Sequence, residues 1–414
     1  MHPGRVFIGM SGGVDSSVAA YLLEKDGYDV TGVFLRSYNV DGCAEQDAED
    51  ARRAAEHIGI PFYVWDVERE YKEKVVKYMV DGYKAGETPN PDVMCNHEIK
   101  FGIFLKRAME MGADYAATGH YVRLRRSDAN PRINAHAANS EPSIYSIGRK
   151  ENFASFAHGS RYLHRLLIAK DNNKDQSYFL WTLTQEQLSH CLFPIGDYTK
   201  PEVRAIARAA GLLTAEKKDS QGICFLGQVT LADFLKTYLP ERVGAVVNTD
   251  GKKIGEHKGA HFFTAGQRHA GFTYRITGAH GTSLKPHYVV RKDVRRNTVT
   301  VAEGPDHQAL YKKEITLRDV NFLSGAPLAM SNGPLFARVR YRQPLAKAML
   351  VPSDKRHATR ETKAAPLGGF NRLTAGKLGV IFDQPQKFVA PGQSAVFYSD
   401  KGEMLGGGVI TAVH

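Results

Sequence analysis

The sequence predicts an α/β protein in which an N-terminal doubly wound parallel sheet is followed by a small central domain and a C-terminal β-barrel. In the first half, short apolar runs alternate with segments of helical periodicity, the order typical of a parallel sheet covered by helices. From about residue 243, short β-prone runs alternate with Gly, Asn and Asp turns, a pattern typical of a small barrel. A chain of 414 residues also exceeds one compact core. We therefore expect domains at 1–225, 226–295 and 296–414.

The composition is that of a globular, basic protein. The hydrophobic content of 43% and the charged content of 24% are those of a globular protein. Because no run approaches the roughly 20 apolar residues of a membrane span, and an apolar strand begins near the N-terminus, we expect a cytoplasmic protein without a membrane segment. The formal net charge of +11 favours an acidic partner such as nucleic acid. Two stretches without periodicity, about 126–159 and 354–377, are expected to be inserted surface loops.

Residues 6–17 organise the first domain. An apolar run ends in Ser11-Gly12-Gly13 and continues into apolar residues at helical spacing, which predicts a strand, a glycine turn and a helix N-terminus. Glycine lets backbone N–H groups approach an anion, and the helix dipole favours negative charge there. The turn lacks the Gly-Lys-Ser/Thr of a Walker A loop and the G-x-G-x-x-G of dinucleotide folds. It predicts a site for phosphate or pyrophosphate, and the alternative is an ordinary glycine turn.

The other elements of the first half continue this alternation. Each expected strand is an apolar, β-prone run, and each expected helix has an apolar face. We expect strands at 30–35, 62–65 and 115–118, and helices at 44–58, 71–80, 96–111 and 200–211. Ligands of such sheets bind beyond the carboxyl ends of the strands. The glycine turn, Leu35 and Gly119-His120 all follow strand ends, so we expect them to line one nucleotide pocket.

A segment with two prolines, Thr88-Pro89-Asn90-Pro91-Asp92, precedes Cys95. The prolines disfavour a helix and predict a rigid turn, with Asn96 as the N-cap of the next helix. Cys95 would then lie beside a helix N-terminus, a position that favours the reactive thiolate. Asp92 is placed to act as an acid or a base. The alternative is a capping turn with a buried cysteine.

A second cysteine, Cys224, lies in Lys217-Lys218-Asp219-Ser220-Gln221-Gly222-Ile223-Cys224. The two lysines could stabilise a thiolate or bind phosphate. The other interpretation is an ordinary core cysteine between apolar neighbours. Sequence spacing does not show whether Cys224 and Cys95 meet.

A basic stretch occurs in the region expected to form the barrel. Residues 336–342 alternate strictly, which predicts a strand with Arg338, Arg340 and Arg342 on one face. Three arginines on one face are suited to a phosphate backbone. A solvated barrel surface is the alternative.

Taken together, these motifs resemble those of a known family. They are GMSGGVDSS at 9–17, TPNPDVMCNHEIKFG at 88–102, ATGHY at 117–121, KDQSYFL at 174–180, KKDSQGICF at 217–225, FTAGQR at 263–268, RVRYRQ at 338–343 and APGQSAVFY at 390–398. On these residues the chain is identified as a member of the bacterial-type tRNA-specific 2-thiouridylases, the MnmA/TrmU family, within the PP-loop ATP pyrophosphatases. The resemblance covers nearly the whole chain and implies an adenine nucleotide alpha hydrolase-like first domain.

The resemblance implies a role for each matched position. The ATP site would comprise Gly9, Met10, Ser11, Gly12, Gly13, Val14, Asp15, Ser16, Ser17, Leu35 and Gly119. The catalytic residues would be Cys95 as the nucleophile, Cys224 as the carrier of a persulfide sulfur, and Asp92 for proton transfer. Asn90, Pro91 and Asp92 would surround the target base, and tRNA would also touch His120, Lys174, Asp175, Gln176, Arg340, Tyr341 and Gln393. Cys43 and Cys191 would be structural, and no side chain is assigned to a metal.

The reaction implied by the resemblance is thiolation of the wobble uridine in the anticodon stem-loop of tRNA. ATP, with Mg²⁺ offsetting its phosphate charge, would adenylate the uracil oxygen and release pyrophosphate. A persulfide on Cys224, loaded by a sulfur-carrier protein or a cysteine desulfurase, would then supply sulfur. Direct attack would leave Cys95 to resolve the product as a disulfide, whereas the other route has Cys95 release sulfide first. The competing hypotheses are a PP-loop enzyme that ligates an amine, which needs no cysteines, and a tRNA-binding protein without this chemistry.

Overall fold

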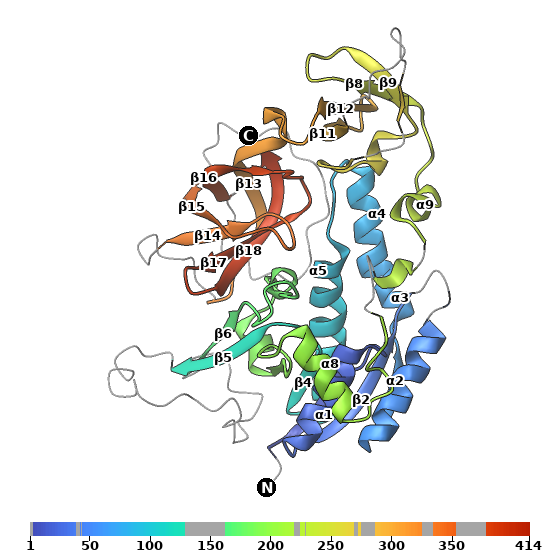
Figure 1. The fold of residues 1–414 in the computed structure, drawn as a ribbon, viewed down its shortest axis with the longest axis vertical. Coiled ribbons are helices and arrows are strands. Elements are labelled where there is room, and N and C mark those ends of the chain that lie inside the picture. The colour runs from blue at the N-terminus through green and yellow to red at the C-terminus, as the bar shows by residue number, and fades with distance from the viewer. Residues whose placement is uncertain are drawn as a thin grey trace.

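The computed structural model describes residues 3–38, 42, 44–128, 162–218, 224–227, 229–268, 272–274, 286–324, 334–352 and 378–414. Three sheets organise these residues. The N-terminal sheet and its helices form one end of an elongated molecule, and the central sheet and the barrel lie side by side at the other end (Figure 1). No helix in these described ranges is long and apolar enough to cross a membrane.

The N-terminal sheet is parallel throughout. It comprises β1 (Arg5–Gly9), β2 (Asp29–Arg36), β3 (Phe62–Asp66), β4 (Tyr115–Thr118) and β7 (Cys191–Leu192), in the order β3-β2-β1-β4-β7. The order runs outward from β1 in both directions, as the predicted doubly wound fold requires. The sheet places the carboxyl ends of β1, β2 and β4 side by side at one edge.

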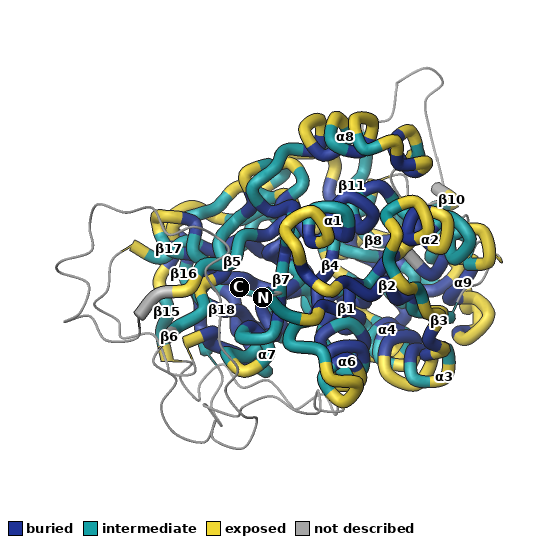
Figure 2. The backbone as a smooth tube through the Cα atoms, turned by 90° about the horizontal axis from the view of Figure 1, so that it is seen from below, coloured by how far each residue is buried: buried dark blue, intermediate teal, exposed yellow. Residues whose placement is uncertain are grey.

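Helices cover both faces of this sheet because successive side chains of a strand point to opposite faces. On one face, Val6 and Ile8 pack with α1 (Val14–Lys25), α2 (Ala44–Ile58) and α8 (Lys200–Ala209). On the other face, Phe7 packs with the end of a long helix. Burial follows this arrangement, since β1, β2 and β4 are largely buried, while the helices and the edge strand β3 carry exposed residues (Figure 2).

The helix that carries Cys95 begins earlier than the sequence predicts. Three segments follow one another without a gap: α5 (Pro91–Cys95), the π-helical η2 (Asn96–Phe104) and α6 (Leu105–Glu110). Asn90, not Asn96, is the N-cap, and its side chain accepts hydrogen bonds from the backbone N–H groups of Asp92 and Val93 at 3.1 and 3.3 Å. Pro91 is compatible with this start because the first helical residue needs no N–H. The predicted rigid turn over Pro91 and the cap at Asn96 are therefore wrong.

The preceding helix is also longer than expected. It is built from α3 (Glu68–Tyr71), the π-helical η1 (Lys72–Val76) and α4 (Lys77–Lys84). Its apolar face packs against α5 around Cys95. These two long helices run toward the central sheet and the barrel (Figure 1).

The central sheet follows α9 (Leu231–Lys236). It contains β8 (Gly244–Val247), β9 (Lys253–His257), β10 (Thr273–Tyr274), β11 (His287–Asp293) and β12 (Thr298–Glu303), in the order β10-β9-β8-β12-β11. Because β12 pairs with both β11 and β8, the sheet extends past residue 295. The domain border expected between 295 and 296 thus divides this sheet.

The barrel has six strands: β13 (Tyr311–Phe322), β14 (Leu335–Arg338), β15 (Ala346–Pro352), β16 (Leu378–Lys387), β17 (Ser394–Ser399) and β18 (Glu403–Val413). Pairing of β13 with β18 closes it. A hairpin of the first domain, β5 (Arg123–Asp128) and β6 (Tyr162–Leu167), pairs with β18 and so joins the barrel sheet. The expected insertion at 126–159 begins inside β5, and its remainder, like 354–377, lies outside the described residues.

The predicted strand of three arginines is wrong in its extent. β14 ends at Arg338, and the chain then turns, with the N–H of Gln343 donating to the carbonyl of Arg340 at 3.2 Å. Arg342 has a φ of +63°, which lies in the left-handed region and outside the ordinary β region. Arg338 is buried and paired with Asp175, so the three side chains do not form one basic face.

Candidate active site

The phosphate loop joins β1 to α1. Gly12 has a φ of +74°, and a Cβ there would lie 2.3 Å from the carbonyl oxygen of Asp47, so the position requires glycine. The N-cap of α1 is Gly13, which has no side chain to cap the N–H groups of the first turn. Gly119, after β4, lies so close that a Cβ would come within 2.7 Å of the Ser16 nitrogen. Backbone N–H groups at this helix N-terminus fit an anion such as phosphate.

The hydroxyl groups of the loop hold its shape. Ser16 Oγ accepts from the N–H of Ser11 at 3.1 Å and donates to the carbonyl of Gly13 at the same distance. Ser17 Oγ also donates to Gly13, at 3.0 Å. These bonds confirm a tight turn at the end of β1. The predicted serines therefore shape the loop in this structure.

Two residues beside the loop were not predicted from the sequence. Lys200, at the start of α8, donates from Nζ to both carboxylate oxygens of Asp15, at 2.8 and 2.9 Å. Tyr121 donates its hydroxyl to the same carboxylate at 2.8 Å. Tyr121 is part of the ATGHY motif, but Lys200 lies 185 residues from Asp15, and no short motif links them.

Asp92 and Cys95 lie on the first turns of the Cys95 helix. Burial raises the pKa of Asp92 above its ordinary value, although nearby Lys100 opposes the shift. A raised pKa makes an aspartate better suited to give and take a proton. Cys95 is 6% exposed and packs in an apolar cluster with Phe225 and Leu226.

The segment of Cys224 reaches this same cluster. Cys224 begins the short helix η5 (Cys224–Leu226), whose Phe225 packs against Tyr71 at a ring-centroid distance of 5.5 Å. Leu35, at the end of β2, packs against the cluster as well. The structure thus brings together three segments that the sequence keeps far apart, the ends of β2, α5 and the KKDSQGICF motif.

The segment before Asn90 is held by all three domains. The carboxylate of Glu87 forms two bonds with Arg318 of the barrel, at 2.7 and 2.9 Å. The N–H of Thr88 donates to the carbonyl of Pro391 at 2.7 Å, and Gln393 Nε2 donates to the carbonyl of Thr88 at 2.7 Å. This junction fixes the chain just ahead of Asp92 and Cys95.

The central sheet also contributes to the junction. Lys292 Nζ donates to the carbonyl of Glu87 at 3.0 Å and lies 5.1 Å from the ring centroid of Tyr83. Burial lowers the pKa of Lys292 to about 7, with the charge of Glu87 opposing the shift. Sequence reasoning missed Glu87, Arg318 and Lys292, because their partners are distant along the chain.

Three residues implied as tRNA contacts are engaged inside the protein. Asp175 is 2% exposed, and its carboxylate pairs with Arg338 at 3.1 Å. Gln176 exchanges bonds with the backbone of Tyr121, at 2.9 Å in each direction. His120 Nδ1 lies 2.8 Å from Thr118 Oγ1, and burial lowers the pKa of this histidine well below its ordinary value.

Two of the remaining implied tRNA contacts, Arg340 and Tyr341, lie where the barrel meets another domain. Arg340 Nη2 donates to the carbonyl of Ala265 in the central domain at 2.5 Å, and burial lowers the pKa of Arg340. The Tyr341 ring packs on Phe179 with centroids 4.6 Å apart. Lys174 is half-buried. Arg340 thus contacts the central domain and Tyr341 contacts the first domain.

The structure describes one of the two cysteines that the resemblance leaves outside catalysis. Cys191 is buried, donates from Sγ to the carbonyl of Gln187 at 3.0 Å, and has its pKa raised by burial, all of which fit a structural residue. Cys43 lies outside the described residues. Within the described ranges, no group of three or more His, Cys, Asp or Glu side chains is placed to hold a metal ion.

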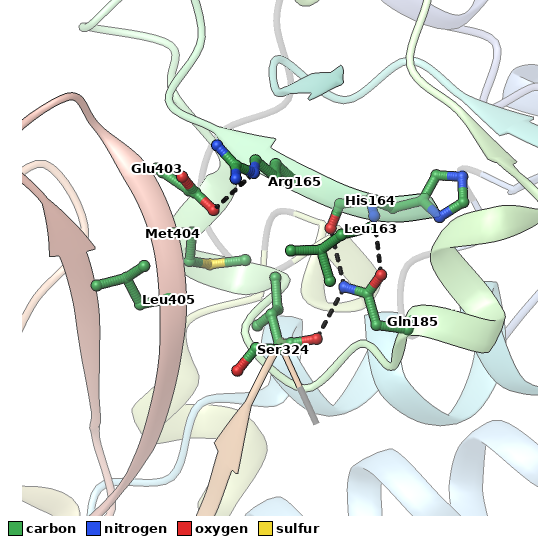
Figure 3. Close-up of a pocket in the computed structure, with 9 residues that line it drawn as sticks. Leu163, His164, Arg165, Gln185, Ser324, Glu403, Met404 and Leu405 are labelled. Carbon is green, nitrogen blue, oxygen red and sulfur yellow. Dashed lines mark hydrogen bonds and ion pairs between the residues drawn. The ribbon is translucent and has the colours of Figure 1, made fainter. Parts of the chain in front are cut away.

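A small pocket lies between the β5–β6 hairpin and the barrel, and none of the predicted site residues lines it (Figure 3). Gln185 spans it, accepting from the N–H of His164 and donating to the carbonyls of His164 and Leu323, each at 2.8 Å. Arg165 and Glu403 form an ion pair of 3.6 Å across its rim. These bonds join the hairpin to the barrel, and the pocket shares no lining residue with the candidate active site.

Family models match three successive parts of the chain: a tRNA methyl transferase HUP domain at 4–228, a tRNA methyl transferase PRC-barrel domain at 232–303, and an aminomethyltransferase β-barrel domain at 312–410. The chain is 42% identical to the tRNA-specific 2-thiouridylase MnmA of Geobacillus thermodenitrificans, over 100% of this chain and 96% of the relative. It is 41% identical to the protein of the same name from Streptococcus mutans, over 98% of this chain and 95% of the relative. The chain belongs to the tRNA-specific 2-thiouridylase family.

Proposed function

We propose that this chain is a tRNA sulfurtransferase that uses ATP to activate the wobble uridine and then transfers sulfur to give 2-thiouridine, AMP and pyrophosphate. The observation that supports this most is the meeting of Leu35, Cys95 and the Cys224 segment in one cluster. Leu35 lies near the carboxyl end of β2, at the sheet edge that also carries the phosphate loop. A nucleotide held at this edge would therefore lie beside both cysteine segments.

The first step requires a better leaving group on the base. The O2 oxygen of uridine attacks the α-phosphorus of ATP, a P–O bond breaks, and pyrophosphate leaves. The loop at the N-terminus of α1 would hold the phosphates through backbone N–H groups, since its first turn has no side-chain cap. Mg²⁺ bound with ATP would offset phosphate charge. We assign no side chain of this chain as its ligand.

The second step transfers sulfur to C2 of the activated base and releases AMP. A persulfide on Cys224 would supply the sulfur, and Cys95 would either resolve the product as a Cys95–Cys224 disulfide or release sulfide from the persulfide first. Asp92 would move the proton, a role that its raised pKa supports. The persulfide would be loaded by a sulfur-carrier protein or a cysteine desulfurase.

Recognition of tRNA would use the junction of the three domains. Asn90, Pro91 and Asp92 form the start of the Cys95 helix, which suits them to surround the target base. Lys174 of the first domain and Arg340, Tyr341 and Gln393 of the barrel would contact the tRNA around that point. Asp175 and Gln176 would act indirectly, because both are bonded within the protein. We place the reaction in the cytoplasm.

The adenylation step is tested with unmodified tRNA and ATP labelled at the α-phosphate. We expect wild type to form AMP only when tRNA is present, and Asp15→Ala to form none while still binding tRNA. Adenylation retained by Asp15→Ala would remove the loop from the proposal. We expect Cys95→Ser and Cys224→Ser to form AMP but no 2-thiouridine. That result would separate adenylation from sulfur transfer. Full thiolation by both cysteine variants would remove the two cysteines from the sulfur transfer. AMP formation by wild type without any thiolation would favour the enzyme that ligates an amine.

A further inference from the structure

The phosphate loop itself contains no cation. Residues 9–17 include no Lys or Arg, and their one charged residue is the carboxylate Asp15. Pyrophosphate carries several negative charges, and a loop of backbone N–H groups beside a carboxylate does not balance them. In P-loop proteins a lysine within the loop meets this need. A positive group supplied from elsewhere in the fold is therefore expected.

The fold brings such a group to the loop from α8. Lys200 Nζ lies 2.8 and 2.9 Å from the two carboxylate oxygens of Asp15, in the first turn of α1. Lys200 is 8% exposed, so its ammonium acts in a partly desolvated site where charge interactions are strong. The pair links α8 to the helix N-terminus that would receive the phosphates.

The backbone around Lys200 is fixed. Thr199 and Glu202 form a capping box, in which the N–H of Thr199 donates to Glu202 Oε2 at 2.6 Å. The N–H of Lys200 donates to Asp171 Oδ2 at 2.9 Å. The lysine therefore presents its ammonium from a rigid base.

A second lysine near the loop is less suited to this role. Lys217 Nζ bonds to Asp47 at 2.7 Å and also to Asp50, both on α2. Lys217 is thus tied to α2, whereas Lys200 bonds to Asp15 within the phosphate loop, where Tyr121 also holds the carboxylate. Of these two lysines, Lys200 is the one bonded to a side chain of the loop.

We propose that Lys200 is a pyrophosphate-binding residue, whose ammonium contacts the β- and γ-phosphates of ATP and the released pyrophosphate. The proposal rests on the proposed use of ATP by this chain. Asp15 competes with the phosphates for the ammonium, so the two residues oppose each other in the binding of a metal-free anion. A lysine that merely ties α8 to α1 would show no such opposition.

The test measures binding of inorganic pyrophosphate, and separately of AMP, by calorimetry in EDTA. We expect Lys200→Met to weaken pyrophosphate binding roughly ten- to a hundredfold, the loss of a charge-assisted hydrogen bond. We expect Asp15→Asn to bind pyrophosphate at least as tightly as wild type. Arg208→Met is the matched control, since Arg208 pairs with Glu216 at the far end of the same helix. AMP, which lacks the β- and γ-phosphates, should bind all four proteins alike.

The outcomes separate the inference from the function on which it rests. Wild type that binds no pyrophosphate would overturn the loop assignment itself. Pyrophosphate binding that Lys200→Met leaves unchanged would overturn only the role of Lys200. If Lys200→Met weakened the binding of pyrophosphate and of AMP equally, Lys200 would have a structural role only. If Lys200→Arg bound pyrophosphate more tightly than Lys200→Met but bound AMP no differently, the proposal would be supported.

Discussion

Replacing Asp175 by asparagine tests whether this residue is an internal anchor, as the structure indicates, or an exposed contact for tRNA. The Asp175 carboxylate accepts from the N–H of Ala169 at 3.1 Å, from the N–H and hydroxyl of Ser177 at 3.2 and 3.0 Å, and from Arg338 Nη1 at 3.1 Å. The Asp175 and Arg338 side chains are 2% and 8% exposed. Asp175→Asn keeps the size of the side chain but leaves the guanidinium buried without a counter-charge.

The magnitude follows from the burial of the pair. Removing one partner of a buried, hydrogen-bonded ion pair costs about 3–5 kcal/mol, because the remaining charge stays desolvated. Arg338 lies with its guanidinium 4.8 Å from the ring centroid of Tyr398, which offsets only a small part of that cost. We therefore expect Asp175→Asn to lower the free energy of unfolding by at least about 3 kcal/mol.

Urea denaturation followed by tryptophan fluorescence measures this change. The chain has two tryptophans, and Trp181 is fully buried beside the pair, donating to Ser394 Oγ at 2.9 Å. A Trp65→Phe background isolates its signal. Asp175→Asn combined with Arg338→Met should be less destabilised than Asp175→Asn alone, since no unpaired charge remains. A loss below about 1 kcal/mol for Asp175→Asn, or strict additivity in the double variant, would refute a buried pair.

Three further predictions follow from the junction of the domains. Arg340→Ala should weaken tRNA binding and reduce the slope of log affinity against log salt by about 1, measured by filter binding; an unchanged slope would remove Arg340 from the tRNA contacts. Lys292, with its pKa lowered to about 7, binds a proton more readily when unfolded, so wild type should gain stability relative to Lys292→Met by up to about 1.4 kcal/mol per pH unit above pH 7. Parallel thermal-unfolding profiles of the two proteins between pH 7 and 9 would contradict that shift. Gly392→Ala should reduce thiolation and stability, because its φ is +90° and a Cβ would lie 2.7 Å from the Thr88 nitrogen. Gly304→Ala, at a φ of +82° with open space around it, is the control and should lose only about 1 kcal/mol.

Much of the first domain could be predicted from the sequence because its signals are local. The helix expected at 44–58 is α2 (Ala44–Ile58), and the strand expected at 115–118 is β4 (Tyr115–Thr118). Apolar periodicity and the charges near helix ends carry this information within a few residues. The sequence misplaces the start of the Cys95 helix because proline usually ends a helix when it lies inside one. At the first helical position proline is favoured, and Asn90 provides the cap.

The parts that could not be predicted depend on contacts between distant segments. Strict alternation suggested a strand through Arg342, but β14 pairs with β15 and β17 only as far as Arg338. Alternation also gave no sign that Asp175, 163 residues away, buries that arginine. The same holds for Lys200 and Asp15. A contact between segments that are distant along the chain leaves no period or short motif in either segment.

The most direct test of the proposed function follows sulfur itself. Wild type is incubated with unmodified tRNA, ATP, Mg²⁺ and a persulfide source labelled with radioactive sulfur, and the tRNA is then digested to nucleosides. The account predicts labelled 2-thiouridine with wild type and none with Cys224→Ser, while AMP formation continues in the variant. Labelled 2-thiouridine formed equally well by Cys224→Ser would contradict it, because sulfur would then reach the base without the cysteine that is proposed to carry it.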